Sequence, residues 1–568
     1  MQNTENKAWK ISVFRRILLL VLCFAGGTLY AAALPPLNWN MAVFVSLLPV
    51  LYCGYNFKWK FSLLCGWIWG LGWAVFSYQF LREIEFFIPY LISPVLAIWP
   101  ALWAALLPRL KEYIFFPAES LLWNVKRKNE YLARELPWYR TVLFTIAAAT
   151  IFTMIEWTRS RLFVWNDLSV TQWRNTYIIQ IAALTGSYGI GFFIVLVNCG
   201  ISAALFCKRN KIAALILPLL SAAGIILFSI VHVEKIKSLP APEKTLRAGL
   251  VQCDLSQRRH ATLEQAVEAV NVCVSLSEQC AALKPEIIIW PESAVPLIFN
   301  GSGSVYEFYR RKFGLLLRET NIPILAGMLT FKADPAEKTY SVTNSALLFN
   351  SDCTMAGRYD KIHRVPFGEY IPFRKYLPES IINAVDMGRD LKAGTNYEPI
   401  NITPEIRASV AICYEGVFGY LMRQFAQRNS DLYIVVSNDA WYPESSEPEQ
   451  HLANSVIRCV ENGMFMIRCG NNGGSGVVTP DGKFTRYIGS NSQRPELLRE
   501  RAVGVVEVPI YKNREKTFFV KYGEWFILIL TAISVLTAAY CVINEFERRK
   551  YSKQLYGETN ESGNNRNN

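Results

Sequence analysis

The sequence predicts a membrane-embedded bundle of about eight helices joined to an α/β domain that lies outside the cytoplasm. Hydrophobic residues make up 52% of the 568 residues and charged residues only 18%, whereas soluble chains have about 25% charged residues. The long apolar runs are confined to residues 1–245 and 525–545, and residues 246–524 have the composition of an ordinary globular domain. Extensive intrinsic disorder is therefore excluded, and a purely soluble protein is disfavoured.

Eight segments approach the length of about 20 mostly apolar residues that a membrane span needs. They are Ile17–Leu34, Met41–Phe57, Phe61–Phe80, Phe86–Leu107, Thr141–Ile155, Gly186–Phe206, Ile212–Val231 and Trp525–Ile543. The fifth is the weakest, with about 15 apolar residues before Glu156. Almost no charged residue falls inside these segments. The first span lacks a preceding cleavage site of small residues, so we expect it to remain as an anchor.

Lysine and arginine are distributed unequally between the two sides of these spans. With the N-terminus in the cytoplasm, the inside segments hold 21 of these residues and the outside loops between spans hold 4. The positive-inside rule therefore places both termini in the cytoplasm and residues 246–524 outside it, with residues 546–568 as a cytoplasmic tail that is disordered from Tyr556. These flanking cations account for the net charge of +13, so nucleic-acid binding is rejected.

The outside domain alternates short apolar runs with helical stretches, which predicts an α/β or α+β sandwich. The strand-like runs are Ala248–Cys253, Glu286–Trp290, Ile322–Met328, Ser345–Phe349, Ala408–Cys413, Leu432–Ser437, Gly476–Thr479 and Ala502–Val508. The clearest helical stretches are Leu263–Leu283 and His451–Asn462. The 13 cysteines form neither a CxxC pair nor a Cys/His zinc pattern.

Three residues could carry out chemistry, and each also has an ordinary interpretation when it is considered alone. Glu292 follows the apolar run Ile287–Ile289, where a partly desolvated carboxylate could act as a general base, although an exposed loop glutamate is commoner. Lys361 lies in a polar segment and could stabilise an oxyanion, or it could belong to a solvated basic loop. Cys413 ends a hydrophobic strand before a turn, as a nucleophile would, although free cysteines are mostly buried.

Together the three residues are much more specific than any one of them. The order and spacing of Glu292, Lys361 and Cys413 resemble the nitrilase superfamily of carbon–nitrogen hydrolases over about residues 246–510. The resemblance implies an αββα sandwich with a Glu-Lys-Cys catalytic triad. Further segments match this superfamily: Ser437–Trp441, His451, Arg458, Glu461, Arg468, Asn471–Gly473 and Pro480–Gly482.

The spans on both sides of the domain select one branch of the superfamily. The whole chain resembles the apolipoprotein N-acyltransferase family of the bacterial inner membrane, whose nitrilase-like domain faces outward between membrane spans. The most specific motif is Val365–Tyr370, V-P-F-G-E-Y, and Glu156–Arg159 and Gly523–Trp525 match membrane-proximal motifs. By this resemblance, four more residues bind substrate or support the triad: Glu369, Tyr414, Glu415 and Trp441.

The chain also departs from the family pattern. Leu162–Trp165 stands where the family has Gly-Phe-Pro-Trp, and Arg258–Ala261 stands where an aromatic residue is expected. The cytoplasmic insert Pro108–Arg140 is long. The first two departures concern the placement of a lipid substrate, and none of the three affects the Glu-Lys-Cys set.

The resemblance implies N-acylation of the N-terminal S-diacylglyceryl-cysteine of apolipoproteins, the last step of lipoprotein maturation. The partners would be a phospholipid acyl donor, a diacylglyceryl apolipoprotein acceptor and the membrane lipid; no metal or organic cofactor is implied. The acyl group would pass through a thioester on Cys413, which needs an apolar mouth that excludes water. The loops Ala294–Phe299 and Ile371–Ile382 could form that mouth, or could equally be packing loops. The expected location is the bacterial inner membrane, with the catalytic domain on the periplasmic side.

Two other functions are compatible with parts of the sequence. A membrane-anchored nitrilase-type amidase would share the triad and hydrolyse a C–N bond, but the V-P-F-G-E-Y string and the eight spans argue against it. A transporter or receptor with an external binding domain would favour charges inside the spans, so it ranks last.

The charge bias gives a direct test of topology. A reporter that is active only outside the cytoplasm should give a signal when fused at Lys237 and none when fused at Lys208, because the seventh predicted span separates these residues. The reverse pattern of reporter activity would contradict an N-terminus in the cytoplasm.

Overall fold

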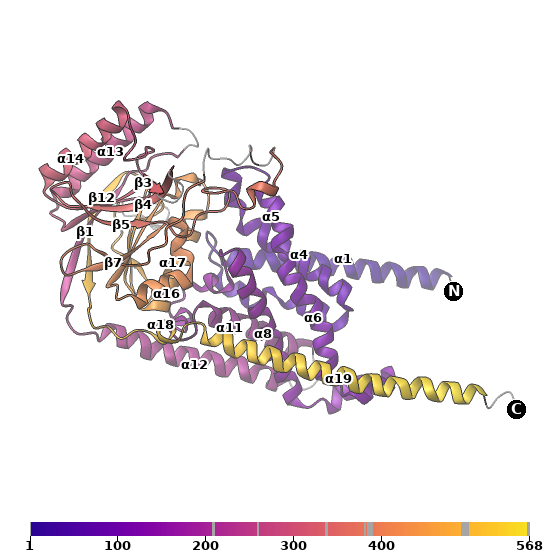
Figure 1. The fold of residues 1–568 in the computed structure, drawn as a ribbon. Helices are drawn as coiled ribbons and strands as arrows, with labels where there is room; N and C mark the ends of the chain where they lie inside the picture. Colours follow the sequence, from indigo (N-terminus) through magenta and orange to yellow (C-terminus); the bar gives the residue numbers. More distant parts are fainter. Residues whose placement is uncertain are drawn as a thin grey trace. The chain divides into compact units, whose positions relative to one another are not determined.

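The computed structural model describes residues 2–206, 211–257, 261–334, 339–379, 382, 390–442, 444–489 and 499–564. The chain divides into two compact units. Met1–Ile181, Thr185–Ile230 and Glu524–Asn568 form the first, and Ala182–Leu184 and Val231–Gly523 form the second. The first unit is helical and the second contains the strands (Figure 1).

Long helices account for most of the first unit. They are α1 (Gln2–Ala33), α4 (Trp59–Ser77), α6 (Ile98–Phe115), α8 (Trp138–Leu162), α11 (Ser187–Phe206), α12 (Lys211–Lys237) and α19 (Trp525–Asn564). Shorter helices connect them: α2 (Val43–Ser46), α3 (Leu48–Asn56), α5 (Ile88–Leu96), α7 (Val125–Glu130) and α9 (Thr176–Ile179). The short helix α10 (Ala182–Thr185) falls almost entirely within the second unit. Small residues allow α1 and α4 to pack closely, since a Cβ added to Gly27 would lie 1.9 Å from the carbonyl oxygen of Trp69.

All eight predicted spans are largely helical. Within the described residues, six helices are long and apolar enough to cross a membrane: Val13–Ala33, Ile88–Phe115, Trp138–Leu162, Ser187–Phe206, Lys211–Lys237 and Trp525–Ser552. The predicted span Met41–Phe57 is instead divided between short helices, with Pro49 in the first turn of α3. The predicted span Phe61–Phe80 corresponds to α4, which is not among the six.

The span predicted to be the weakest extends well beyond its expected end. Helix α8 has 25 residues and continues through Glu156 and Arg159, which are both buried. The expectation of almost no charge inside the spans is therefore wrong for this helix. Its charges persist because each has an internal partner, as buried charges require.

A polar network around α8 provides these partners. Arg159 pairs with the carboxylate of Asp167 and donates a hydrogen bond of 3.1 Å to the carbonyl oxygen of Trp165. The backbone N–H of Leu168 donates to Glu156 Oε1 at 2.9 Å. The loop that departs from the family's Gly-Phe-Pro-Trp is thus held by the side chains of the Glu156–Arg159 motif.

The long insert Pro108–Arg140 packs against α19 within the same unit. Arg548 pairs with Glu112 at 2.8 Å, and Tyr113 donates to Glu545 at 2.9 Å. The α19 helix continues to Asn564, so the tail expected to be disordered from Tyr556 is helical up to that residue. The polar segment carries no proline that would end the helix.

The second unit contains two mixed six-stranded sheets in its described part. The first sheet has the order β12-β1-β2-β3-β4-β5 and the second has the order β11-β10-β9-β8-β7-β6. The strands of the first are β1 (Lys244–Gln252), β2 (Ile287–Trp290), β3 (Ile324–Asp334), β4 (Thr339–Phe349), β5 (Met355–Asp360) and β12 (Ala502–Ile510). Those of the second are β6 (Ile400–Asn401), β7 (Arg407–Ile412), β8 (Leu432–Ser437), β9 (Met466–Gly470), β10 (Gly476–Val478) and β11 (Phe484–Thr485).

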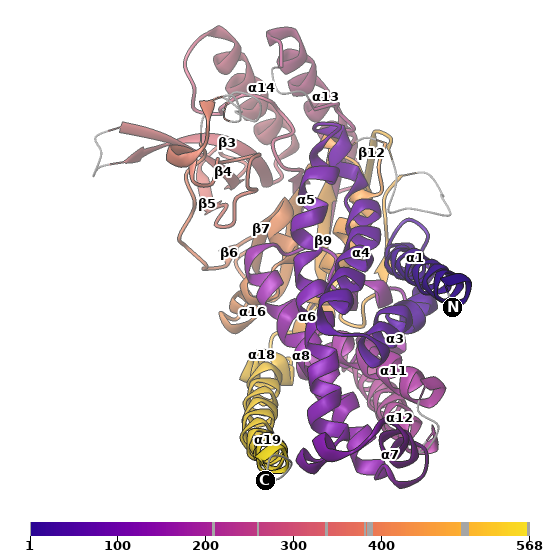
Figure 2. The same cartoon turned by 90° about the vertical axis from the view of Figure 1, so that its right-hand side faces the viewer.

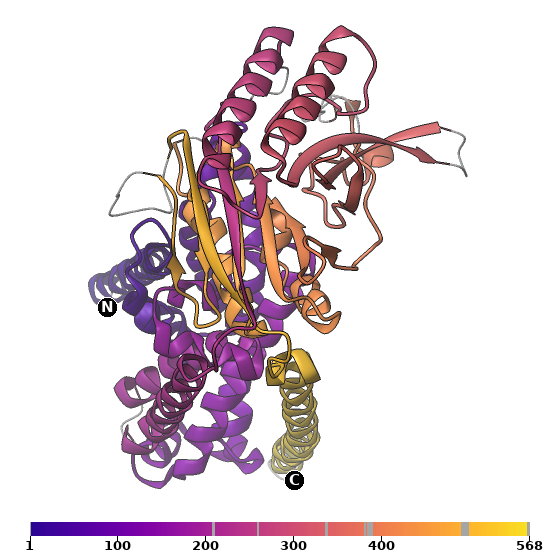
Figure 3. The same ribbon diagram turned by 90° about the vertical axis from the view of Figure 1, so that its left-hand side faces the viewer.

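Three parallel strands form the centre of each sheet, and antiparallel strands complete its edges. The antiparallel pair of β1 and β12 is visible along its length in Figure 3. The two sheets face each other, because β1 and β2 contact β9 and β4 contacts β7. Their strands are almost entirely apolar at the centre, as expected for strands that are buried on both faces.

Helices cover the outer faces of the two sheets. Helices α13 (Leu263–Ala281) and α14 (Ser304–Thr320) lie side by side and share a hydrophobic core with the first sheet (Figure 2). Helix α16 (Gly419–Gln427) covers the second sheet, where Tyr433 on β8 donates a 2.7 Å hydrogen bond to the carbonyl oxygen of Met422. Helix α17 (Glu447–Asn462) packs beside α16 and is buried along its whole length. The unit is therefore the αββα sandwich that the sequence resemblance implies.

The buried network on α8 predicts unequal effects for two arginines of the same helix. Arg159→Ala would leave Glu156 and Asp167 buried without a cation, which costs about 3–5 kcal/mol. Arg161→Ala is the matched control, because Arg161 is partly exposed in its pair with Glu524 and should contribute at most about 1 kcal/mol. Thermal denaturation of the detergent-purified protein would measure both effects. Equal melting temperatures for the two variants would contradict the inferred role of the network.

Candidate active site

Three strands of the second unit end at the residues singled out from the sequence. Glu292 stands two residues beyond β2, Lys361 directly follows β5, and Cys413 directly follows β7. The first two residues come from one sheet and Cys413 comes from the facing sheet. The sandwich thus brings together side chains that lie far apart in the sequence.

Lys361 is held between two carboxylates. Its Nζ lies 3.2 Å from Glu292 Oε1 and 3.0 Å from Glu369 Oε1. Lys361 is 1% exposed and Glu292 is 6% exposed. Burial alone would lower the pKa of Lys361, but the negative charges of Glu292 and Glu369 outweigh it and hold that pKa well above its ordinary value. The lysine is therefore a fixed cation at neutral pH.

The V-P-F-G-E-Y string forms the loop that delivers Glu369. The backbone N–H of Val365 donates to Glu369 Oε2 at 2.8 Å, and the N–H of Glu369 donates back to the carbonyl oxygen of Val365 at 2.9 Å. Phe367, inside this turn, has a φ of +62°. The compact turn fixes one carboxylate oxygen on its own backbone and leaves the other facing Lys361.

Asn344 on β4 is a component of the site that the sequence did not reveal. Its Nδ2 donates to Glu292 Oε1 at 2.6 Å and to Glu369 Oε1 at 2.9 Å. Its backbone carbonyl accepts a 2.8 Å bond from the N–H of Lys361. The only signal was a polar residue directly before the predicted strand Ser345–Phe349. Asn344 separates the two carboxylates and orients them toward the lysine.

Glycine allows the backbone beside Glu292 to approach the neighbouring strand. A Cβ on Gly327 of β3 would lie 2.5 Å from the carbonyl oxygen of Pro291 and 2.6 Å from the Cα of Glu292. Any larger residue would displace the loop that carries the carboxylate.

Cys413 occupies a strained turn. Its φ is +53°, a left-handed conformation that a residue with a side chain rarely adopts. Its carbonyl oxygen lies 3.0 Å from His451 Nε2, and His451 Nδ1 lies 2.9 Å from Asp439 Oδ1. Arg468 pairs with the same aspartate. The buried chain of Arg468, Asp439 and His451 therefore holds the backbone of the Cys413 turn through its carbonyl oxygen.

Burial raises the pKa of the Cys413 thiol well above its ordinary value, and the charge of Glu292 acts in the same direction. The Lys361 cation opposes this rise without cancelling it. The resting group is therefore a thiol, and it needs a base to become a nucleophile. Burial also disfavours the charged form of Asp439, but Arg468 and His451 together hold the pKa of Asp439 below its usual value.

Glu415 connects the turn of Cys413 with the loop that follows Lys361. It is fully buried and accepts from the hydroxyl of Tyr359 at 2.8 Å, and from the backbone N–H groups of Ile362 at 2.7 Å and Ile412 at 2.8 Å. Burial raises the pKa of Glu415 to about 7, although these hydrogen bonds favour the charged form. Glu415 thus holds the backbone next to Lys361 and the backbone next to Cys413 in fixed positions.

Two asparagines from the matched segments join further loops of the site. Asn438 donates to the carbonyl oxygen of Glu292 at 3.3 Å, and Asn471 donates to Asn438 Oδ1 at 3.0 Å. Asn471 also accepts from the N–H of Leu255 at 3.1 Å. The loops after β1, β2, β8 and β9 are therefore connected by side-chain amides.

The remaining expected site residues lie at the edge of this cluster. Tyr414 and Trp441 are half-buried, and Tyr414 packs against the ring of Phe418 at 4.9 Å between centroids. Residues Arg258–His260, at the expected aromatic position, lie outside the described residues.

The two loops proposed for an apolar mouth differ. In Ala294–Phe299, the side chains of Ala294, Val295 and Leu297 belong to the hydrophobic core, so packing is their role. In the described part of Ile371–Ile382, Phe373 is 78% exposed and Tyr376 is 72% exposed. Of the described residues in these two loops, those of the second include the strongly exposed aromatic side chains.

A buried cation, two carboxylates and an adjacent thiol on a strained turn can carry out acyl transfer through a covalent intermediate. Residues 247–499 match the carbon–nitrogen hydrolase family, which defines the class of the second unit. Residues 26–200 match the apolipoprotein N-acyltransferase N-terminal domain. The chain belongs to the apolipoprotein N-acyltransferase family, and it is a membrane protein with a nitrilase-like domain.

Relatives of this family match most of the chain. An apolipoprotein N-acyltransferase of Geobacter metallireducens is 28% identical, covering 70% of this chain and 74% of its own length. One from Gloeobacter violaceus is 26% identical, covering 92% of this chain and 94% of its own length. Among solved structures, a mutant amidase of the nitrilase superfamily from Nesterenkonia AN1 matches 47% of this chain and 93% of its own, at 15% identity and a TM-score of 0.32.

Substitution of Lys361 tests the need for a fixed cation. Lys361→Met removes the charge, and Lys361→Arg replaces a compact ammonium by a planar fork that the two carboxylates cannot hold in the same way. Both variants should lose acyl transfer by about 100- to 1000-fold, the usual cost of one oxyanion donor. Near-normal turnover by either variant, in protein that still inserts in the membrane, would remove Lys361 from the mechanism.

Substitution of Asn344 tests the separation of the carboxylates. Asn344→Asp is nearly isosteric but places a third carboxylate beside Glu292 and Glu369, with one lysine to neutralise them. The cluster should then retain a proton to higher pH, so the acid limb of the rate–pH profile should move upward by roughly one unit. Asn350→Asp, an exposed position just after β4, is the control. A profile that coincides with that control would contradict the role given to Asn344.

Proposed function

We propose that the protein transfers an acyl chain from a phospholipid to the free α-amine of an S-diacylglyceryl-cysteine at the N-terminus of an apolipoprotein. The observation that supports this most strongly is the buried Glu292–Lys361–Glu369 cluster next to Cys413, in a chain with both regions of the family. Glu292, Lys361 and Cys413 form the catalytic triad in this proposal, and residues 246–524 form the catalytic domain.

The first half-reaction forms a thioester. Glu292 takes the proton of the Cys413 thiol, and the thiolate attacks the ester carbonyl carbon of the phospholipid. Lys361 and a backbone N–H of the turn stabilise the oxyanion. The ester C–O bond then breaks, the leaving alkoxide takes the proton back from Glu292, and a lysophospholipid departs. The raised pKa of the Cys413 thiol supports the need for this base, because little thiolate would exist without it.

The second half-reaction transfers the chain to nitrogen. The acceptor amine attacks the thioester carbonyl, Glu292 takes a proton from the attacking nitrogen, and the C–S bond breaks as the thiol is restored. The product is an amide, which is more stable than the thioester. No oxidant, reductant or cofactor is required for either step.

Both proposed substrates are lipid-anchored, which gives a physical reason for the membrane unit. The exposed Phe367, Phe373 and Tyr376 would form an apolar mouth for them. The charge bias of the sequence supports a catalytic domain on the periplasmic side of the bacterial inner membrane. Glu369 and Glu415 would position the triad, and Tyr414 and Trp441 would contact substrate.

An amidase that hydrolyses a small C–N substrate remains the second candidate, because it would use the same triad. It differs in that water resolves the thioester. A phospholipid would then leave no acyl group on the enzyme, and a lipopeptide acceptor would gain none.

Intact mass of the protein with a defined phospholipid tests the acyl-enzyme. We expect a single acyl adduct on Cys413, release of lysophospholipid, and loss of the adduct when a diacylglyceryl lipopeptide is added. Cys413→Ser should abolish the adduct, because a hydroxyl is much harder to deprotonate than a thiol. Glu292→Gln should slow adduct formation, since it keeps the shape and removes the base.

The other cysteines of the second unit serve as controls. Cys459→Ser is well matched because Cys459 is fully buried in the same domain, and this variant should keep the adduct. An adduct that maps to Cys459 or another of these cysteines would refute the assignment of Cys413. A stable protein with no adduct, but with amide hydrolysis, would favour the amidase.

A further inference from the structure

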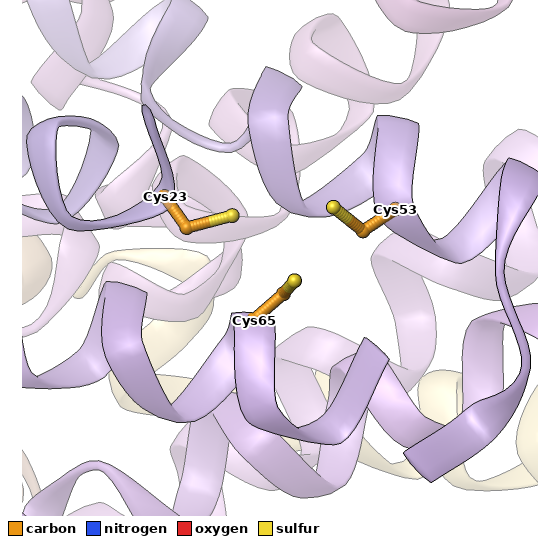
Figure 4. Close-up of side chains that lie close together, drawn as sticks. All are labelled: Cys23, Cys53 and Cys65. Atoms are coloured by element: carbon orange, nitrogen blue, oxygen red, sulfur yellow. The ribbon is translucent and has the colours of Figure 1, made fainter. Parts of the chain in front are cut away.

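Three cysteines converge inside the membrane unit, far from the proposed nucleophile in the sequence. Cys23 on α1, Cys53 on α3 and Cys65 on α4 are each 0% exposed, and none is in a disulfide. Their Sγ atoms point toward one another and all lie within 4.8 Å of one another (Figure 4). Three different helices therefore present one sulfur each to a common centre.

We propose that this cluster is a three-thiolate site for a soft monovalent metal ion, Cu(I). Thiolates select soft ions such as Cu(I) over Mg²⁺ or Ca²⁺, which prefer oxygen ligands. The three helices need to move only slightly for all three sulfurs to bind one central ion. Three Cu–S bonds form and three thiol protons are released, with no change in the oxidation state of copper or sulfur.

The ligand number argues for Cu(I) rather than Zn²⁺. Structural zinc sites are almost always tetrahedral, with four nitrogen, sulfur or oxygen ligands. Within the described residues, the group that could hold an ion here comprises the three cysteines alone, without a fourth His, Asp, Glu or Cys. Cu(I) is stable with three sulfur ligands in a plane, so the site is complete for it.

Charge near the cluster favours an anionic complex. One Cu(I) with three thiolates carries a net charge of −2, which would be costly in an apolar bundle. Arg15 and Arg16 lie about two helical turns before Cys23 on α1. Arg15 donates a 2.6 Å hydrogen bond to the hydroxyl of Tyr52, the residue next to Cys53. One cation, Arg15, is thus bound to the residue that adjoins Cys53.

The predicted topology also suits the site. With the N-terminus in the cytoplasm, Arg15, Arg16 and the cluster lie toward the cytoplasmic side, where thiols stay reduced. The site is independent of the proposed acyl transfer, because it uses none of the residues of the second unit.

Anaerobic titration of the full-length protein in detergent with Cu(I), against a coloured Cu(I) chelator, tests the proposal. The parent for this experiment is Cys413→Ala/Cys253→Ser/Cys273→Ser, which removes the nucleophile and the pair of thiols whose Sγ atoms lie 3.2 Å apart, since these could also bind copper. We expect one tightly bound Cu(I) per chain, and X-ray absorption should show a shell of three sulfur atoms.

Cluster variants identify the ligands. Cys23→Ser, Cys53→Ser and Cys65→Ser should each weaken binding by more than about 100-fold, since even the loss of an outer-shell partner costs 10- to 100-fold. Cys199→Ser is the matched control, because Cys199 is also fully buried on a long apolar helix but lies outside the cluster, and it should bind as the parent does.

Two results would overturn the proposal. One is a parent that binds no stoichiometric Cu(I), which would leave the cysteines as small packing residues between the helices. The other is a tight three-sulfur site that survives all three substitutions. The measurement on the parent needs no cluster variant, so poor folding of such a variant would not prevent a decision.

Discussion

The buried ammonium of Lys361 is the interaction on which the second unit's polar interior depends. Removing a lysine from water is costly, and only its two carboxylate partners make the charged form favourable. Those carboxylates would in turn repel each other without the lysine and the Asn344 amide between them. The charges therefore have to be assembled together, which explains why residues from β2, β4, β5 and the V-P-F-G-E-Y loop meet at one point.

The cysteine side of the site is organised by a different constraint, the shape of the backbone. A left-handed residue at the end of a buried strand persists only where the surroundings hold it. Here the His451–Asp439–Arg468 chain contacts the carbonyl of Cys413, and Glu415 accepts from the N–H just before it. Glu415 also accepts from the loop after Lys361. One buried carboxylate thus relates the position of the cysteine turn in one sheet to that of the lysine loop in the other.

Much of this could be predicted from the sequence, because apolar strands that end in polar residues leave a clear pattern. All eight strand-like runs overlap observed strands. Two of these runs lead to a predicted site residue: Glu292 follows one, and Cys413 ends another. Strand β5 was missed because Met355–Asp360 is polar and half-exposed, and β9 because Arg468 interrupts an apolar run. Their pairing depends on contacts with distant strands, which local composition does not record.

Side-chain partners were the least predictable part, in both units. In the sequence Asn344 looks like an ordinary polar residue at a strand edge, and only the pairing of β4 with β3 and β5 shows that its amide meets Glu292 and Glu369. Glu156 and Arg159 marked the apparent end of a span, although the helix continues because Asp167 lies on the loop that folds back against it.

The chemistry of a cysteine thiol likewise depends on the side chains around it, which the sequence alone does not reveal. Burial, and then the charge of Glu292, raise the pKa of Cys413 well above its ordinary value, and the Lys361 cation opposes this rise, so the resting group is a neutral thiol. A resting thiol is less easily oxidised than a thiolate, and in the proposed mechanism Glu292 would produce the thiolate once the ester is bound. In the proposed mechanism, the reactivity therefore depends on how Glu292 and Lys361 are placed around the sulfur, and not on a permanently ionised cysteine.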